Sequence, residues 1–206
     1  MLLDVNDSHL LLVDYQIRLM PALFDGAGAL ANGVRLGQMA KLLQVPITGT
    51  EQNPAGLGES APEIRALCDT TLAKMHFSAC ADGLVQLLRP PVSQTARPQS
   101  GNVRSLPKHL QKPPVAAPGS GRNTIVMGGC ETHVCFMQTA LDLLDEEFEV
   151  WVVTDACASR TERNRDAAFD RLASAGAELL TTEMVAFEWL RTAQHPQFKA
   201  VLGLVK

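Results

Sequence analysis

Residues 123–154 read NTIVMGGCETHVCFMQTALDLLDEEFEVWVVT and contain three segments of different periodicity. Residues 123–127 form a short apolar run rich in β-branched side chains, as in a buried strand. Residues 134–146 place apolar side chains at helical spacing, and residues 149–154 form a second short apolar run. A strand, a helix and a strand in this order predict a βαβ unit, whose strands lie parallel in one sheet.

The same alternation extends from this unit toward both ends of the chain. We expect further strands at 9–15, 45–50, 70–75 and 177–181. We expect further helices at 29–43, 62–67, 82–88, 163–175, 184–192 and 197–204, and a loop at 50–60. The pattern predicts the α/β class: a three-layer αβα sandwich around a mostly parallel, doubly wound sheet of about six strands.

Composition limits the classes of function. The chain has 206 residues, 46% of them hydrophobic, and a net charge of −4. It is long enough for one large core, and it lacks the basic surface that nucleic-acid binding requires. The N-terminal stretch MLLDVNDSHLLLVDY carries acids where a signal peptide is basic, and no apolar run is long enough to span a bilayer. We therefore expect a cytoplasmic protein that contacts neither membrane nor nucleic acid and keeps its five cysteines as thiols.

Residues 90–122 interrupt the pattern. They hold seven of the twelve prolines and no acidic residue, and they show no periodicity. Such a composition is typical of a flexible insertion rather than of a second folding unit. We therefore expect one domain, residues 1–206, with a Pro-rich insertion at 90–122 that serves as a lid, a partner-binding arm or an inert surface loop.

Reactive side chains follow several of the predicted strands. In a parallel sheet the ligand site lies beyond the carboxyl ends of the strands. Asp14 follows the first strand, Lys74 lies at the end of the third, and residues 128–135 follow the fourth. Position alone therefore makes these residues candidates for a site, although an aspartate at a strand end is commonly only a turn residue.

The cysteines of segment 128–135 allow several interpretations. Cys130, His133 and Cys135 could bind a metal, but their spacing is unlike that of a structural zinc site. Cys130 and Cys135 could form a redox pair, or both could be inert buried thiols. Alternatively, Cys135 is a nucleophile near a helix N-terminus, where free N–H groups and a nearby lysine lower a thiol pKa. In that case Asp14 would be the base, Lys74 the cation, and Cys135 the most reactive of the thiols.

Separate motifs resemble the isochorismatase-like cysteine hydrolase superfamily. They are LLLVDYQ (10–16), KMHFSAC (74–80), GGCETHVCFMQTALDLL (128–144) and VTDACASR (153–160). Together with TEQNPAGLGES (50–60) they are most similar to the isochorismatase domain-containing proteins of unassigned substrate and their octameric bacterial relatives. The resemblance covers nearly the whole chain except 90–122.

The resemblance implies roles for particular residues. Cys135 would be the nucleophile, Asp14 the general base and Lys74 the third member of a catalytic triad. A cis peptide bond would join Cys130 to Glu131, and the N–H groups of Glu131 and Cys135 would form an oxyanion hole. Side chains lining the substrate pocket would include Gln16 and Gln52.

Positions at which this sequence differs from the family's motifs exclude some of the family's activities. The nicotinamidase branch carries an Asp/His metal site after its second strand, whereas this chain has TGTEQNPAGLGE there, so we expect neither metal nor cofactor. Cys80 stands where the family usually has Phe. We expect a homo-oligomeric hydrolase that cleaves a C–N bond of a small amide or carbamoyl substrate through a thioester. The alternatives are a non-catalytic scaffold of the same fold and a thiol redox protein using Cys130 and Cys135.

Overall fold

The structure, a computed structural model, describes residues 1–89 and 121–206. The expected insertion at 90–122 therefore lies outside the described residues except for its last two. Of these, Arg122 belongs to the folded body, because its Nη1 donates to the carbonyl oxygens of Val5 at 2.6 Å and Ser8 at 2.9 Å. These two bonds anchor the start of the following strand to the N-terminal segment.

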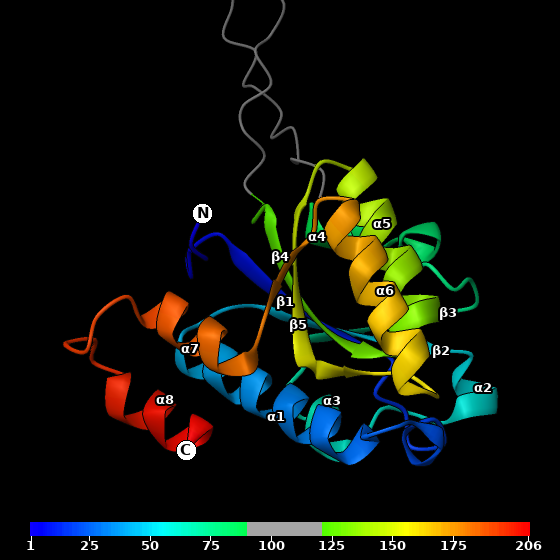
Figure 1. The fold of residues 1–206 in the computed structure, drawn as a ribbon, viewed down its shortest axis with the longest axis horizontal. Helices are drawn as coiled ribbons and strands as arrows, with labels where there is room; N and C mark the ends of the chain where they lie inside the picture. The colour runs from blue at the N-terminus through cyan, green and yellow to red at the C-terminus, as the bar shows by residue number, and fades with distance from the viewer. Residues whose placement is uncertain (90–120) are drawn as a thin grey trace, which may run out of the picture.

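The core of the molecule is a parallel sheet of six strands (Figure 1). The strands are β1 Ser8–Val13, β2 Ile47–Gln52, β3 Thr70–Lys74, β4 Thr124–Cys130, β5 Glu149–Ala158 and β6 Glu178–Leu180. Their order is β3-β2-β1-β4-β5-β6, and every neighbouring pair is parallel. The order reverses direction at β1 and β4, so the sheet is doubly wound, which confirms the predicted fold class.

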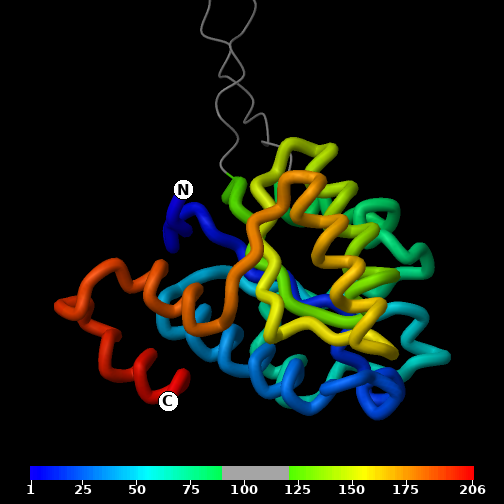
Figure 2. The backbone as a smooth tube through the Cα atoms, in the orientation of Figure 1, coloured from blue at the N-terminus to red at the C-terminus, as the bar shows by residue number. Residues whose placement is uncertain are grey.

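Helices cover both faces of the sheet (Figure 1). One face carries α1 Gly26–Leu42, α3 Pro62–Arg65, α7 Thr182–Leu190 and α8 Phe198–Val205. The other carries α4 Leu84–Leu88, α5 Met137–Asp145 and α6 Glu162–Ser174. In Figure 2 the C-terminal segment lies beside α1, with which α7 and α8 pack. In the described part of the chain, no helix has both the length and the apolar character needed to cross a membrane.

Two segments differ from the sequence-based expectation. The short helix α2, Pro54–Leu57, lies where a loop was expected; Pro54 begins it, and a proline favours the first helical position. The helix expected at 134–146 is divided into a π-helical turn, Thr132–Phe136, followed by α5. In that turn the Phe136 N–H bonds the Glu131 carbonyl five residues earlier, so one extra residue is accommodated before the α-helix begins.

The glycine pair before this turn brings β4 close to its neighbours. A Cβ atom on Gly129 would lie 2.5 Å from the Val13 carbonyl oxygen, and one on Gly128 would lie 2.9 Å from the Tyr15 hydroxyl. No other residue type fits at such distances. The glycines therefore allow close packing of β4 against its neighbours.

Candidate active site

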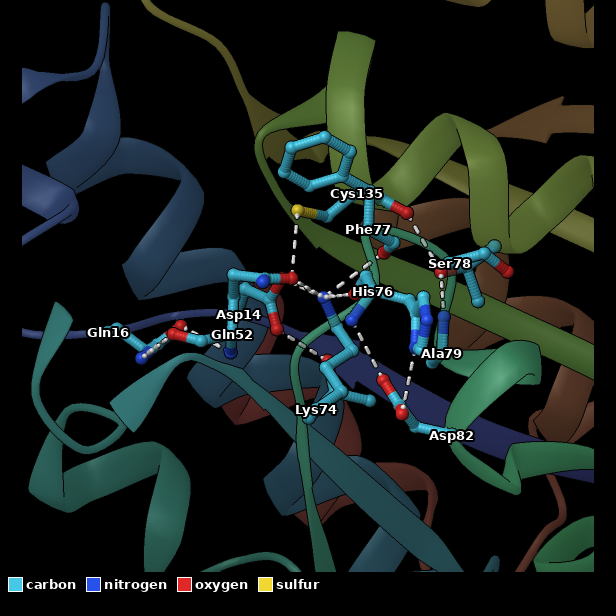
Figure 3. Close-up of polar contacts among 12 residues, drawn as sticks. Asp14, Gln16, Gln52, Lys74, His76, Phe77, Ser78, Ala79, Asp82 and Cys135 are labelled. Atoms are coloured by element: carbon cyan, nitrogen blue, oxygen red, sulfur yellow. Dashed lines mark hydrogen bonds and ion pairs between the residues drawn. The ribbon is translucent and has the colours of Figure 1, made fainter. Parts of the chain in front are cut away.

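Four elements bring polar side chains together at the carboxyl edge of the sheet. Asp14 directly follows β1, Gln52 ends β2, Lys74 ends β3, and Cys135 lies in the turn after β4. Because these strands are neighbours in the order β3-β2-β1-β4, residues up to 121 positions apart in sequence meet at one point (Figure 3). All four are buried.

Lys74 is surrounded by oxygen atoms. Its Nζ lies 2.8 Å from Asp14 Oδ2, and both side chains are inaccessible to solvent. The same nitrogen donates to Gln52 Oε1 at 2.7 Å, to the Phe77 carbonyl at 3.1 Å and to the His76 carbonyl at 3.5 Å. A buried charge is tolerated only when it is paired and hydrogen-bonded, and these oxygens satisfy that requirement.

Asp14 is held in an orientation that leaves one oxygen open. Its backbone φ is 53°, in the left-handed region that Asp and Asn adopt more readily than most residues. Oδ1 accepts a hydrogen bond of 2.6 Å from the Thr50 hydroxyl. Oδ2 accepts none from the described residues, although Lys74 Nζ lies within ion-pair distance. A carboxylate oxygen that is held by one ion pair and lies beside a thiol is suited to accept a proton.

The Cys135 thiol lies against this ion pair. Its Sγ is 3.7 Å from Gln52 Oε1. Burial, followed by the Asp14 carboxylate, raises the pKa of the thiol to about 12, whereas Lys74 acts in the lowering direction. The expected lowering of this pKa was wrong for two reasons: the cysteine sits inside a π-helical turn, and burial with a facing carboxylate outweighs the single cation. At neutral pH the thiol is therefore protonated and needs a base.

The structure places Cys130 and Cys135 on opposite faces of the sheet. Cys130 Sγ contacts Met20 Sδ at 3.8 Å in the core under α1, whereas Cys135 belongs to the core on the opposite face of the sheet. Both are free thiols, so the geometry does not favour a redox pair. His133 Nδ1 lies 3.0 Å from the Ser159 hydroxyl. Among the described residues, no group of three or more His, Cys, Asp or Glu side chains is arranged to hold a metal ion.

Gln16 and Gln52, both expected in the pocket, have different environments. Gln52 touches the thiol and the ammonium group, as described above. Gln16 is fully buried, and its amide bonds only backbone groups: Nε2 donates to the Gln52 and Gly58 carbonyls, and Oε1 accepts from the Gln52 N–H. Its side chain therefore joins the ends of β1 and β2, and both of its N–H groups are used by backbone carbonyls.

Glu131 follows β4 at the start of the π-helical turn. The peptide bond between Cys130 and Glu131 is cis. The Glu131 side chain does not turn toward the thiol; its Oε1 pairs with Arg160 Nε at 2.5 Å. Any part that Glu131 takes in the site would therefore involve its backbone N–H group.

Sequence reasoning missed the contacts that hold the loop after β3. The Ser78 hydroxyl donates to Asp142 Oδ2 at 2.5 Å, and the Ala79 N–H donates to the Thr139 hydroxyl at 3.0 Å. These bonds tie to α5 the loop whose carbonyls hold Lys74. Ser78 lies in the quoted motif KMHFSAC, but nothing in the sequence indicates that its partner is 64 residues away.

Thr50 was also missed. Its hydroxyl orients Asp14 from the neighbouring strand. In the sequence it is one more polar residue of the TEQNPAGLGES segment, with no spacing signal that points to Asp14.

Known proteins are similar to this chain over nearly its whole length. The isochorismatase domain matches residues 106–184. Isochorismatase domain-containing protein 2 of Xenopus laevis is 34% identical over 203 residues, which cover 98% of this chain and 85% of the relative. The protein of the same name from Rattus norvegicus is 32% identical over 201 residues, which cover 98% and 82%.

Solved structures of related proteins have a similar fold. The MAR1 ribonuclease of Caenorhabditis elegans superimposes with a TM-score of 0.81 at 26% identity, covering 100% of this chain and 92% of that one. The YcaC protein of Escherichia coli, described as an octameric hydrolase of unknown specificity, superimposes with a TM-score of 0.80 at 27% identity, covering 99% and 89%.

Proposed function

The chain belongs to the isochorismatase domain family of hydrolases, and we propose that it is a cysteine hydrolase that cleaves a carbon–nitrogen bond of a small amide or carbamoyl substrate. One observation carries this proposal: a buried thiol lies beside a carboxylate whose Oδ2 accepts no hydrogen bond from the described residues. Thiol acyl chemistry requires a nucleophilic sulfur and, where the thiol is protonated at neutral pH, an adjacent base that takes its proton.

The first half of the proposed reaction forms a thioester. Asp14 Oδ2 takes the proton from Cys135 Sγ as the sulfur attacks the substrate carbonyl, so thiolate develops only in the transition state. The backbone N–H groups of Glu131 and Cys135 stabilise the oxyanion of the tetrahedral intermediate. The protonated Asp14 then gives its proton to the leaving nitrogen, the C–N bond breaks, and an amine or ammonia departs.

The second half regenerates the thiol. Asp14, again ionised, takes a proton from water, and the resulting hydroxide attacks the thioester carbonyl. The C–S bond breaks, the acid product leaves, and the proton on Asp14 returns to the sulfur. Lys74, whose ammonium group lies 2.8 Å from Asp14 Oδ2, compensates the charge of Asp14 whenever that side chain is ionised.

We infer that the protein acts as a homo-oligomer on a small molecule. The solved relative from Escherichia coli is described as an octamer, and the matching fold covers nearly all of this chain. A net charge of −4 provides no general attraction for nucleic acid. Light scattering at micromolar concentration tests the assembly, and a monomer mass of 22.2 kDa would contradict it.

Ammonia release from a panel of small amides and carbamoyl compounds tests the activity. We expect turnover of at least one compound by the wild-type protein and none by Cys135→Ala. Cys68→Ala serves as the matched control, because Cys68 is a free thiol outside the site and its loss should leave turnover unchanged. Equal turnover by wild type and Cys135→Ala would contradict the proposed nucleophile.

A single-stranded RNA belongs in the same panel, because one solved relative is described as a ribonuclease. A cysteine hydrolase for amides should leave RNA intact. If the wild type cleaves RNA and Cys135→Ala does not, the substrate class is a phosphodiester and the proposed amide is wrong.

A further inference from the structure

The side-chain amide of Gln52 lies between the thiol and the ammonium group of the site (Figure 3). Its Oε1 is 2.7 Å from Lys74 Nζ and 3.7 Å from Cys135 Sγ. One neutral oxygen therefore accepts from the two donors that flank the proposed base. Because Gln52 is buried, this contact is made with little competition from water.

The neighbours of Gln52 determine which way its amide points. Nε2 lies 2.8 Å from the Met75 carbonyl, which can only accept a hydrogen bond, and the ammonium group of Lys74 can only donate. Turning the amide over would place NH₂ against an ammonium group and oxygen against oxygen. The oxygen must therefore face the thiol.

The backbone of Gln52 is held as firmly as its side chain. The Gln16 amide accepts from the Gln52 N–H at 2.8 Å and donates to the Gln52 carbonyl at 3.0 Å. The same Nε2 donates to the Gly58 carbonyl at 2.6 Å. Gln16 thereby fixes the end of β2 against the extension of β1, and Oε1 of Gln52 has little freedom to move away from the sulfur.

We propose that Gln52 is a positioning residue that holds resting Cys135 as a neutral thiol directed at Oε1. This inference rests on the proposed role of Cys135 as the nucleophile. An amide oxygen stabilises S–H as an acceptor, and it presents the negative end of its dipole to a thiolate. Since the thiolate is the form that alkylating and oxidising agents attack, Gln52 protects the resting nucleophile.

Two substitutions at this position separate positioning from simple structural support. Gln52→Met removes the oxygen and keeps the length of the side chain. Gln52→Glu keeps the shape and adds a negative charge beside the sulfur. Both lose the hydrogen bond to the Met75 carbonyl, so a purely structural role would change both variants in the same direction.

The readout is alkylation of Cys135 by iodoacetamide at pH 8, located by mass spectrometry. Well below the thiol pKa the rate follows the fraction of thiolate. We expect Gln52→Met to raise the rate about fivefold, the effect of one neutral hydrogen bond, and Gln52→Glu to lower it about tenfold. Cys68 is the internal reference, because it lies outside the site and burial raises its pKa to about 11; its rate should not change.

Opposite shifts at Cys135 support the inference. Shifts in the same direction, or unchanged rates in variants that melt like the wild type, overturn it. If one variant does not fold, the sign of the change in the other decides: a slower alkylation of Cys135 in Gln52→Met, or a faster one in Gln52→Glu, overturns the inference. If the rates diverge as expected but Cys135→Ala retains turnover, the positioning of the thiol stands and the proposed nucleophile is wrong.

Discussion

The two ends of the parallel sheet both bury polar side chains, in full or in part, but the hydrogen-bonding groups of these side chains are satisfied differently. At the amino end His9 Nε2 lies 2.9 Å from the Thr48 hydroxyl, and the Asp7 carboxylate accepts from the Asn123 N–H at 3.0 Å and the Thr124 hydroxyl at 2.9 Å. At the carboxyl end Asp14 Oδ2 is the only buried side-chain nitrogen or oxygen without a hydrogen-bond partner among the described residues. Saturated polar groups stabilise a fold, whereas an open acceptor beside a thiol is available for chemistry.

The strongest test of this contrast exchanges one oxygen for nitrogen at each end. Asp14→Asn should lower turnover by about 10³-fold, because an amide cannot accept the thiol proton. The fold should survive, since asparagine tolerates the φ of 53° at this position. Asp7→Asn is the matched control before β1 and should leave turnover unchanged. Similar losses of turnover in the two variants would remove the distinction between the ends.

The second test removes the lysine of one ion pair at each end of the sheet and compares the resulting losses of stability. One pair is buried and the other is exposed. Lys74→Met leaves the Asp14 carboxylate buried and uncompensated, so we expect the free energy of unfolding to fall by about 3 kcal/mol. Lys41→Met breaks the pair with Asp69, whose side chains are 42% and 50% exposed, and should cost about 0.5 kcal/mol or less. Denaturant unfolding measures both, and equal losses would contradict the assignment of Lys74 to a solvent-free site.

The amino end should control stability at acid pH. Burial lowers the pKa of His9 from 6.5 to about 4, with a smaller contribution from Arg122. The unfolded state therefore binds the proton more tightly, and stability is fully present above about pH 6.5 and is lost as the pH falls toward 4. We expect this loss to be on the order of 2 kcal/mol and to be reduced in His9→Gln, which does not titrate. An unchanged acid profile in that variant would show that other groups dominate.

The smallest effect on stability is expected from a change outside the two ends of the sheet, in the segment 90–120. We propose that residues 90–120 are dispensable for folding of the domain. A Cβ on Gly121 would lie 3.1 Å from the Leu88 carbonyl oxygen, so the flanking segments are neighbours and a short Gly/Ser linker can join them. Replacing 90–120 while keeping Arg122 should change the free energy of unfolding by about 1 kcal/mol or less. Loss of cooperative thermal unfolding would show that the segment belongs to the core.

The prediction from sequence succeeded where the signal is local. The strands expected at 9–15 and 149–154 appear as β1 and β5, because a buried parallel strand is a short apolar run that can be recognised without knowing its neighbours. Helix α6 ends as expected just before Gly176, whose φ is 103°. The π-helical turn before α5 was not expected, because one extra residue in a turn leaves the apolar spacing almost unchanged.

The candidate site was only partly accessible to the same reasoning. Asp14, Lys74 and Cys135 follow apolar runs, and parallel strands bring their carboxyl ends to one edge, so their proximity could be anticipated from strand order and motif resemblance. Hydrogen-bond partners could not be anticipated. Thr50 orients Asp14 from the neighbouring strand, and the Gln16 amide makes three hydrogen bonds to backbone groups.

The direction of the Cys135 pKa shows most clearly where sequence reasoning ends. From the chain alone, a cysteine before a helix with a lysine elsewhere in the motif set suggests a lowered pKa. The folded structure reverses this, because burial and the Asp14 carboxylate outweigh the Lys74 ammonium and raise the pKa to about 12. Which charges meet, and how much water remains between them, depends on the packing of strands that are distant in the chain. Secondary structure could be predicted because its apolar periodicity is a property of neighbouring residues. The pKa of Cys135 could not, because it depends on charges and burial that arise only when distant strands pack together.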